Sequence, residues 1–75
     1  GSLLIQGEYK MNLKVGIWKT YSDGKLSSET SYANGIENGN FVSYVNGKVA
    51  VTGEYRNGIK VNRWLRYDEN GNRIG

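Results

Sequence analysis

Apolar and polar residues alternate along most of the chain, and turn residues interrupt this alternation every ten to twelve positions. A period of two predicts short antiparallel strands. Asp23-Gly24 and Asn46-Gly47 lie between such runs. They are strong signals for two-residue hairpin turns, because both turn residues there need positive φ. Since the chain has no proline and no helical periodicity, the sequence predicts an all-β fold.

The expected strands span residues 3–10, 16–22, 25–33, 40–45, 48–56 and 62–68. Residues 11–14 form a turn in which Asn12 stands where the later copies have Gly35 and Gly58, and Asn tolerates a left-handed backbone well. Residues 34–38 are expected to form a longer connection. After Asn70-Gly71, residues 72–75 would begin a return strand, which suggests that an array was cut or continues elsewhere.

Every aromatic residue belongs to one of three series in which members stand 23 positions apart. We call them the aromatic ladder (Trp18, Phe41, Trp64), the first tyrosine row (Tyr9, Tyr32, Tyr55) and the second tyrosine row (Tyr21, Tyr44, Tyr67). A fixed period of this length marks units that stack to bury their apolar faces. Residues 3–75 are therefore predicted to be one domain of about three antiparallel hairpin repeats, each of about 23 residues, in an elongated, twisted meander sheet. Gly1-Ser2 resembles an expression scar.

Regular hairpin pairing places both tyrosine rows on one face of this sheet. The aromatic ladder lies three residues from the second tyrosine row, and an odd step predicts the opposite face. A β-bulge at Gly16, Gly39 or Asn62 would instead turn the ladder toward the tyrosine side. The ladder is expected either to pack between repeats, under side chains such as Lys48, Arg56 and Arg66, or to form a partly exposed contact surface.

Composition argues against catalysis and against metal or cofactor binding. The 75 residues include no Cys and no His, so the usual general base and the commonest metal ligands are missing. Glu8 and Glu54 are equivalent repeat positions on a sheet face, so they make a poor acid and base pair. The net charge is +3, and all of the excess lies after Asn38. Because these charges form no clustered basic stripe, nucleic acid is not an expected partner.

The residues Gly16-Ile17-Trp18-Lys19-Thr20-Tyr21, followed by Asp23-Gly24-Lys25 and Tyr32-Ala33-Asn34-Gly35, resemble the bacterial variant of the MORN repeat. The resemblance covers about three units, with departures at Thr30, Phe41 and Asn62. It implies stacked hairpins and a surface for protein interaction or dimerisation. It also implies a possible affinity for acidic lipids or a role as the antitoxin or immunity partner of a toxin. Only the aromatic residues match the motif, at positions that are mainly structural in the family, so no binding residue is transferred.

The sequence therefore predicts a protein-interaction module that is not an enzyme. Open sheet edges accept strands, and Leu3, Leu4 and Ile5 are too apolar for an exposed edge. We expect a partner, a second copy or a missing part of the protein to cover them. The alternative is a binder of carbohydrate or anionic lipid, in which rings stack on sugars and nearby cations meet phosphates. The candidate binding surface comprises Trp18, Phe41, Trp64, Arg63 and Arg66, and the longest apolar run is far too short to cross a membrane.

Overall fold

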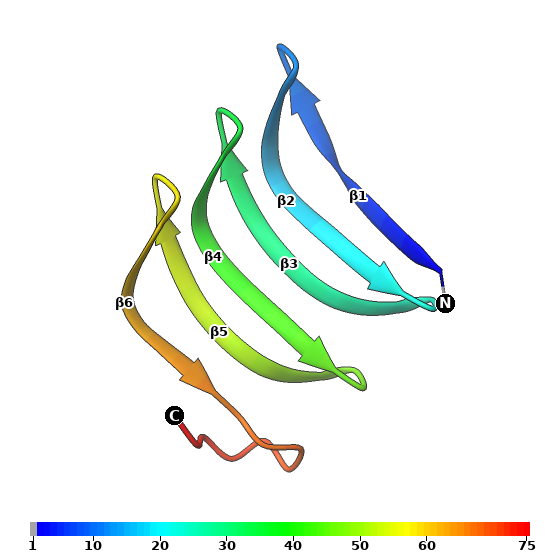
Figure 1. Cartoon of the computed structure of the whole chain (residues 1–75), viewed down its shortest axis with the longest axis vertical. Coiled ribbons are helices and arrows are strands. Elements are labelled where there is room, and N and C mark those ends of the chain that lie inside the picture. The colour runs from blue at the N-terminus through cyan, green and yellow to red at the C-terminus, as the bar shows by residue number, and fades with distance from the viewer. Residues whose placement is uncertain (1) are drawn as a thin grey trace.

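Six strands form one antiparallel sheet in which each strand pairs with its neighbours in the chain (Figure 1). The computed structural model describes residues 2–75, so Gly1 of the proposed scar lies outside the described residues. The strands are β1 (Leu3–Lys10), β2 (Leu13–Ser22), β3 (Lys25–Ala33), β4 (Ile36–Val45), β5 (Lys48–Arg56) and β6 (Ile59–Arg66). The predicted all-β hairpin meander is confirmed. Residues 2–75 contain no helix, and hence none long and apolar enough to cross a membrane.

Each pair of consecutive strands is joined by a two-residue turn with both residues at positive φ, as a type I′ turn requires. The four-residue turn expected at residues 11–14 and the longer connection expected at residues 34–38 are also two-residue turns, because β2 and β4 begin already at Leu13 and Ile36. Four of the five turns begin with Asp or Asn and continue with Gly. The first is Met11-Asn12, at φ 53° and 66°.

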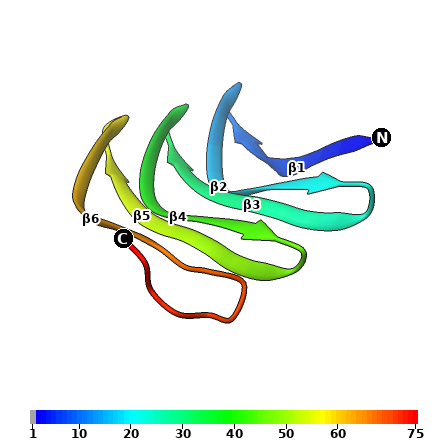
Figure 2. The ribbon, with the colours of Figure 1, turned by 60° about the horizontal axis from the view of Figure 1, so that its bottom comes forward.

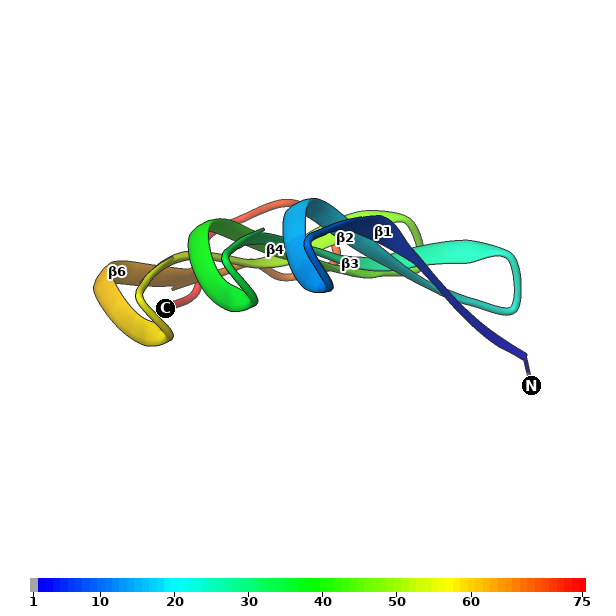
Figure 3. The same cartoon turned by 90° about the horizontal axis from the view of Figure 1, so that it is seen from above.

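The sheet is a single layer, as the view along its plane shows (Figure 3). Its principal extents are 41 × 32 × 14 Å. Trp18, with 8% of its surface exposed, is the only buried residue among residues 2–75. Most domains pack two layers around a core. In this chain, cross-strand pairs of half-buried side chains must instead supply most of the stability.

The β1–β2, β3–β4 and β5–β6 hairpins each bend at a bulge in which one residue lies opposite three (Figure 2). In the first hairpin, Gln6 pairs with Lys19 and Glu8 with Val15, so Gly7 alone faces residues 16–18. In β5 the equivalent Gly53 faces residues 62–64, whereas in β3 the unpaired residue is Ser31, one position further along the repeat, which faces residues 38–40. The bulged strands pass through positive φ at Gly16 (74°), Gly39 (116°) and Asn62 (61°). These are the three positions at which the sequence allowed a bulge.

The segment after β6 folds back along that strand. Tyr67 forms an isolated bridge with Arg73, and Ile74 N–H donates to Arg66 O at 2.8 Å. The carboxylate of Asp68 accepts the backbone N–H groups of Asn70 and Asn72, both at 2.9 Å. These bonds, chiefly the one from Asn72, lower the pKa of Asp68. The chain therefore returns along β6 as predicted for residues 72–75, but through an isolated bridge and not through a strand.

Candidate functional site

The bends give the sheet a concave face, and the aromatic ladder lines it. Lys14 Nζ lies 4.7 Å from the ring centroid of Trp18, four positions along β2. In a straight strand the two Cα atoms would be about 13 Å apart. The chain therefore bends at Gly16 toward the side that carries both side chains. Lys60 and Trp64 repeat this contact in β6, also at 4.7 Å.

The ladder packs edge to face against the first tyrosine row. Trp18 contacts Tyr9 and Tyr32, with ring centroids 5.0 and 6.1 Å apart. Tyr55 contacts Phe41 at 6.0 Å and Trp64 at 5.1 Å, and the rings of Phe41 and Trp64 stack at 5.4 Å. Edge-to-face pairs at these distances are favourable contacts between aromatic rings. The ladder and the first tyrosine row therefore share one face of the sheet.

The second tyrosine row lies on the other face, so the prediction that all six tyrosines share a side is wrong. The hydroxyl of Tyr44 donates to Glu29 Oε1 at 2.6 Å. Glu29 lies three residues before Tyr32 in β3, which places it on the opposite face. The reason is one extra residue in the register of the β2–β3 pair and of the β4–β5 pair. In the β4–β5 pair, Tyr44 pairs with Val49 but Ser43 pairs with Val51. Ala50 is therefore an inserted residue, and the rest of β5 changes side.

Glycine makes room for each tryptophan. A Cβ atom added at Gly7 would overlap the ring of Trp18, and one added at Gly53 would overlap the ring of Trp64. Each indole N–H then donates to a strand carbonyl at 3.2 Å, Glu8 O for Trp18 and Glu54 O for Trp64. In the middle hairpin Thr30 replaces glycine and pairs with Phe41, a smaller ring without an N–H group. The sequence carries a signal for this pairing that we did not use, because glycine accompanies tryptophan twice and threonine accompanies phenylalanine once.

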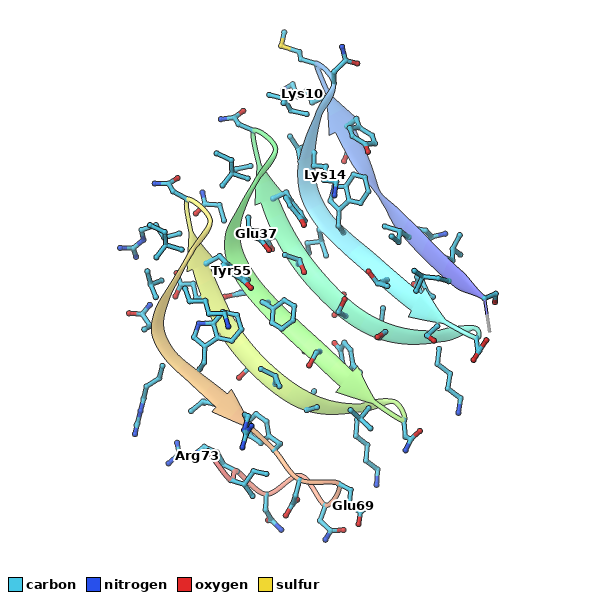
Figure 4. All side chains as sticks on the ribbon, viewed as in Figure 1. Lys10, Lys14, Glu37, Tyr55, Glu69 and Arg73 are labelled. Carbon is cyan, nitrogen blue, oxygen red and sulfur yellow. The ribbon has the colours of Figure 1, made fainter. Side chains whose placement is uncertain are left out.

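Lys14 and Glu37 lie near the rings, and neither is among the side chains that we expected there. Lys14 Nζ lies 4.7 Å from the Trp18 ring and 4.9 Å from the Tyr32 ring, within the range of cation–π contact. Glu37 takes the equivalent position in the middle hairpin, near Tyr55 (Figure 4). Burial is the main reason why the pKa of Tyr55 is raised, and the charge of Glu37 adds to it. The predicted cover residue Lys48 instead donates to Glu69 O in the C-terminal loop, at 2.9 Å.

The structure divides the candidate surface that the sequence predicted. Trp18 is buried, and Phe41 and Trp64 are half-buried among tyrosines. Arg63 and Arg66 are exposed on β6. The rings of the ladder thus hold the bent sheet together, and the arginines are free to contact other molecules.

The edge strand β1 carries three consecutive exposed aliphatic residues. All residues of β1 are exposed, with 67% of Leu3, 55% of Leu4 and 54% of Ile5 accessible to solvent. Asp23 N–H donates to Ser2 O at 2.9 Å, so Ser2 points its backbone toward β2. Backbone groups alternate in direction along an antiparallel strand. Leu3 and Ile5 consequently point their N–H and C=O groups away from the sheet.

Other surfaces offer less chemistry. An open hollow of about 610 Å³ lies beside the C-terminal loop, lined by Lys48, Val49, Thr52, Tyr67, Glu69, Asn70 and Gly71. Glu29 is held by Tyr44 and lies 3.9 Å from Lys19 Nζ. Residues 2–75 contain no group of three or more His, Cys, Asp or Glu side chains that could hold a metal ion.

Compared with protein-family models, with curated proteins and with solved structures, the chain matches none of them. The likeness to MORN repeats stays a prediction from the residues quoted above.

Proposed function

We propose that this chain is a non-catalytic protein-interaction module that binds an extended segment of another polypeptide along the open edge of β1. The observation that carries the proposal is the coincidence of two features on this edge. Leu3, Leu4 and Ile5 are more than half exposed, and Leu3 and Ile5 direct unpaired backbone groups outward. A strand that adds there satisfies these groups and covers the apolar side chains in one step.

The state of the ladder supports the edge as the binding surface. A recognition surface needs rings with accessible faces, whereas Trp18 is buried between two tyrosines and beneath Lys14. Binding as an antitoxin or immunity partner, which the likeness to MORN repeats suggests, would be an interaction of this same class.

The non-catalytic part of the proposal has its own support. The carboxylate of Glu29 already accepts the Tyr44 hydroxyl and lies beside Lys19, so it is engaged in the sheet. Glu8 and Glu54 belong to separate hairpins, on β1 and β5. A general acid and base need to converge on one reacting group in a shared cleft, and these carboxylates do not.

Binding of anionic lipid or carbohydrate is the second candidate, and it rests on the exposed side chains of Lys60, Arg63 and Arg66 on β6. Pelleting with acidic liposomes at low and at high salt distinguishes lipid binding from carbohydrate binding. Salt-sensitive pelleting would support lipid binding, because surface charge attraction is screened by ions.

Strand addition at β1 can be tested with a peptide library displayed on phage and selected against the immobilised chain. Ile5→Pro removes an outward N–H without touching the hydrogen bonds to β2, and proline is tolerated on edge strands with this orientation. We expect selected peptides to bind the wild type and to lose binding to Ile5→Pro. The matched control, Ile5→Thr, retains the N–H and should retain most binding. Peptides that bind Ile5→Pro as well as the wild type would refute the proposal.

A further inference from the structure

Equivalent positions at the two ends of the sheet differ in how well they are covered. Leu13 and Ile36, which begin β2 and β4, are 45% and 47% exposed, whereas Ile59 at the start of β6 is 66% exposed. The turn of the next hairpin explains the difference. The Cβ direction of Gly35 meets Leu13 Cδ2 at 3.2 Å, and that of Gly58 meets Ile36 Cγ2 at 3.3 Å. Within residues 2–75 no further hairpin turn follows to cover Ile59.

A backbone hydrogen bond accompanies each of these contacts. Gly35 N–H donates to Lys14 O at 2.9 Å, and Gly58 N–H donates to Glu37 O at 2.8 Å. The equivalent acceptor on the last strand is Lys60 O. The equivalent donor on the first turn is Asn12 N–H, at the opposite end of the sheet. The last strand thus offers the acceptor, and the first turn offers the donor, of a hydrogen bond that the chain forms twice between its own hairpins.

The aromatic face shows the same complementarity. Trp18 has a tyrosine on both sides, Tyr9 and Tyr32, whereas Trp64 contacts Tyr55 on β5 and has its other side at the sheet edge. Lys14 lies over two rings, and Lys60 lies over one. In β1 the residue equivalent to Tyr32 is Tyr9, which is exposed at the other edge.

We propose that copies of this chain associate head to tail, with β1 of a second copy added to β6 in the register that β3 has on β2. The inference rests on the proposed function, in which β1 is the binding edge. In the internal register Ile17 pairs with Ser31, and the equivalent positions bring Arg63 opposite Glu8 of the second copy. Opposite charges therefore meet across the junction. The same register brings the second copy's Tyr9 beside Trp64 and its Asn12 N–H to Lys60 O.

The bend favours this arrangement over a symmetric pairing of two β1 strands. Head-to-tail addition keeps the bends of successive strands in one line, as within the chain. A two-fold axis between two β1 edges would place their bends at Gly7 on opposite sides of the axis, so pairing would end near Gly7.

Residues 72–75 set a limit on the association. They occupy the edge of β6 at Arg66, where Ile74 N–H donates to Arg66 O. The start of the incoming β1 must displace them, whereas residues 6–10 of that strand meet a free edge. A chain shortened to residues 1–71 should therefore associate more tightly than the full chain.

The register can be tested by disulfide formation, because the chain has no cysteine of its own. We expect an oxidised mixture of Glu8→Cys and Arg63→Cys to yield a covalent heterodimer, identified by mass, while each variant alone stays mostly monomeric. The matched control pairs Glu8→Cys with Glu69→Cys, which is also an exposed position but lies outside the junction, and should give far less product. Disulfide between two copies of Glu8→Cys, or no product in the mixture, would overturn the head-to-tail inference. Peptide binding that depends on β1, found together with either of these results, would leave the proposed function standing.

Discussion

The pairing of ring size with the residue beneath it can be tested by converting the last hairpin to the sequence of the middle one. Trp64 lies over Gly53, where any Cβ would overlap its ring, whereas Phe41 pairs with Thr30. Gly53→Thr alone should expel the tryptophan from its place. Combined with Trp64→Phe, the same threonine should be accommodated.

The cost of the single change follows from the contacts that the ring would lose. Trp64 makes edge-to-face and stacked contacts with Tyr55 and Phe41, each worth about 1 kcal/mol, and one hydrogen bond to Glu54 O worth about 1 kcal/mol. Gly53→Thr should therefore lower the free energy of unfolding by about 3 kcal/mol, less a gain in strand propensity of up to about 1 kcal/mol. Trp64→Phe retains the ring contacts and should cost about 1–2 kcal/mol. The double variant should lose no more than about 2 kcal/mol, which gives a coupling of about 2 kcal/mol between the two sites.

Urea denaturation followed by far-UV circular dichroism measures these values without relying on the tryptophan signal. The matched control is the cycle of Gly53→Thr with Trp18→Phe. Trp18 lies over Gly7 on β1, so these two changes should add within about 0.5 kcal/mol. A coupling below about 0.5 kcal/mol between positions 53 and 64 would refute the idea that glycine is required by the ring above it.

Three further predictions concern single positions. Met11→Asn should raise Tm by about 3–6 °C in a thermal scan, because Asn tolerates the φ of 53° better than Met; an unchanged Tm would count against turn strain. Gly39→Ala should lower the free energy of unfolding, measured in urea, by about 2 kcal/mol, because φ is 116° and the new Cβ would lie 2.9 Å from Ser31 Cβ. Adding Ser31→Gly should recover part of the loss. No recovery would argue against that contact. The hydrogen bond to Glu29 raises the pKa of Tyr44, so its stabilising effect is present below the unfolded pKa and is lost as pH rises through the folded pKa. Alkaline absorbance titration should show an earlier Tyr44 transition in Glu29→Gln, and identical curves would contradict the assignment.

Local signals in the sequence predicted the order of the strands and the positions of the Asp-Gly and Asn-Gly turns, because they depend on neighbouring residues, but β2, β4 and β6 begin earlier than predicted. Asp23-Gly24 and Asn46-Gly47 form the turns that their positive φ requirement predicted. The side of the sheet on which each row lies depends instead on register, and one inserted residue reverses it. Nothing in the sequence marks Ala50 as inserted, so the second tyrosine row was placed on the wrong face.

The single-layer architecture makes the two ends of the sheet matter more than they would in a domain with a core. Each hairpin is stabilised by the next, through a turn that covers an aliphatic residue and a tyrosine that covers a ring. Stability in such an array is close to a sum of nearest-neighbour terms, so within residues 2–75 the first and last hairpins lack one term that the middle hairpin has. Three features reflect this missing contact with a neighbouring hairpin: Ile59 is exposed, Trp64 is covered by a tyrosine on one side, and the edge of β1 is unpaired. The missing surfaces are copies of surfaces that the chain already carries, and this equivalence is the basis of the head-to-tail association proposed above.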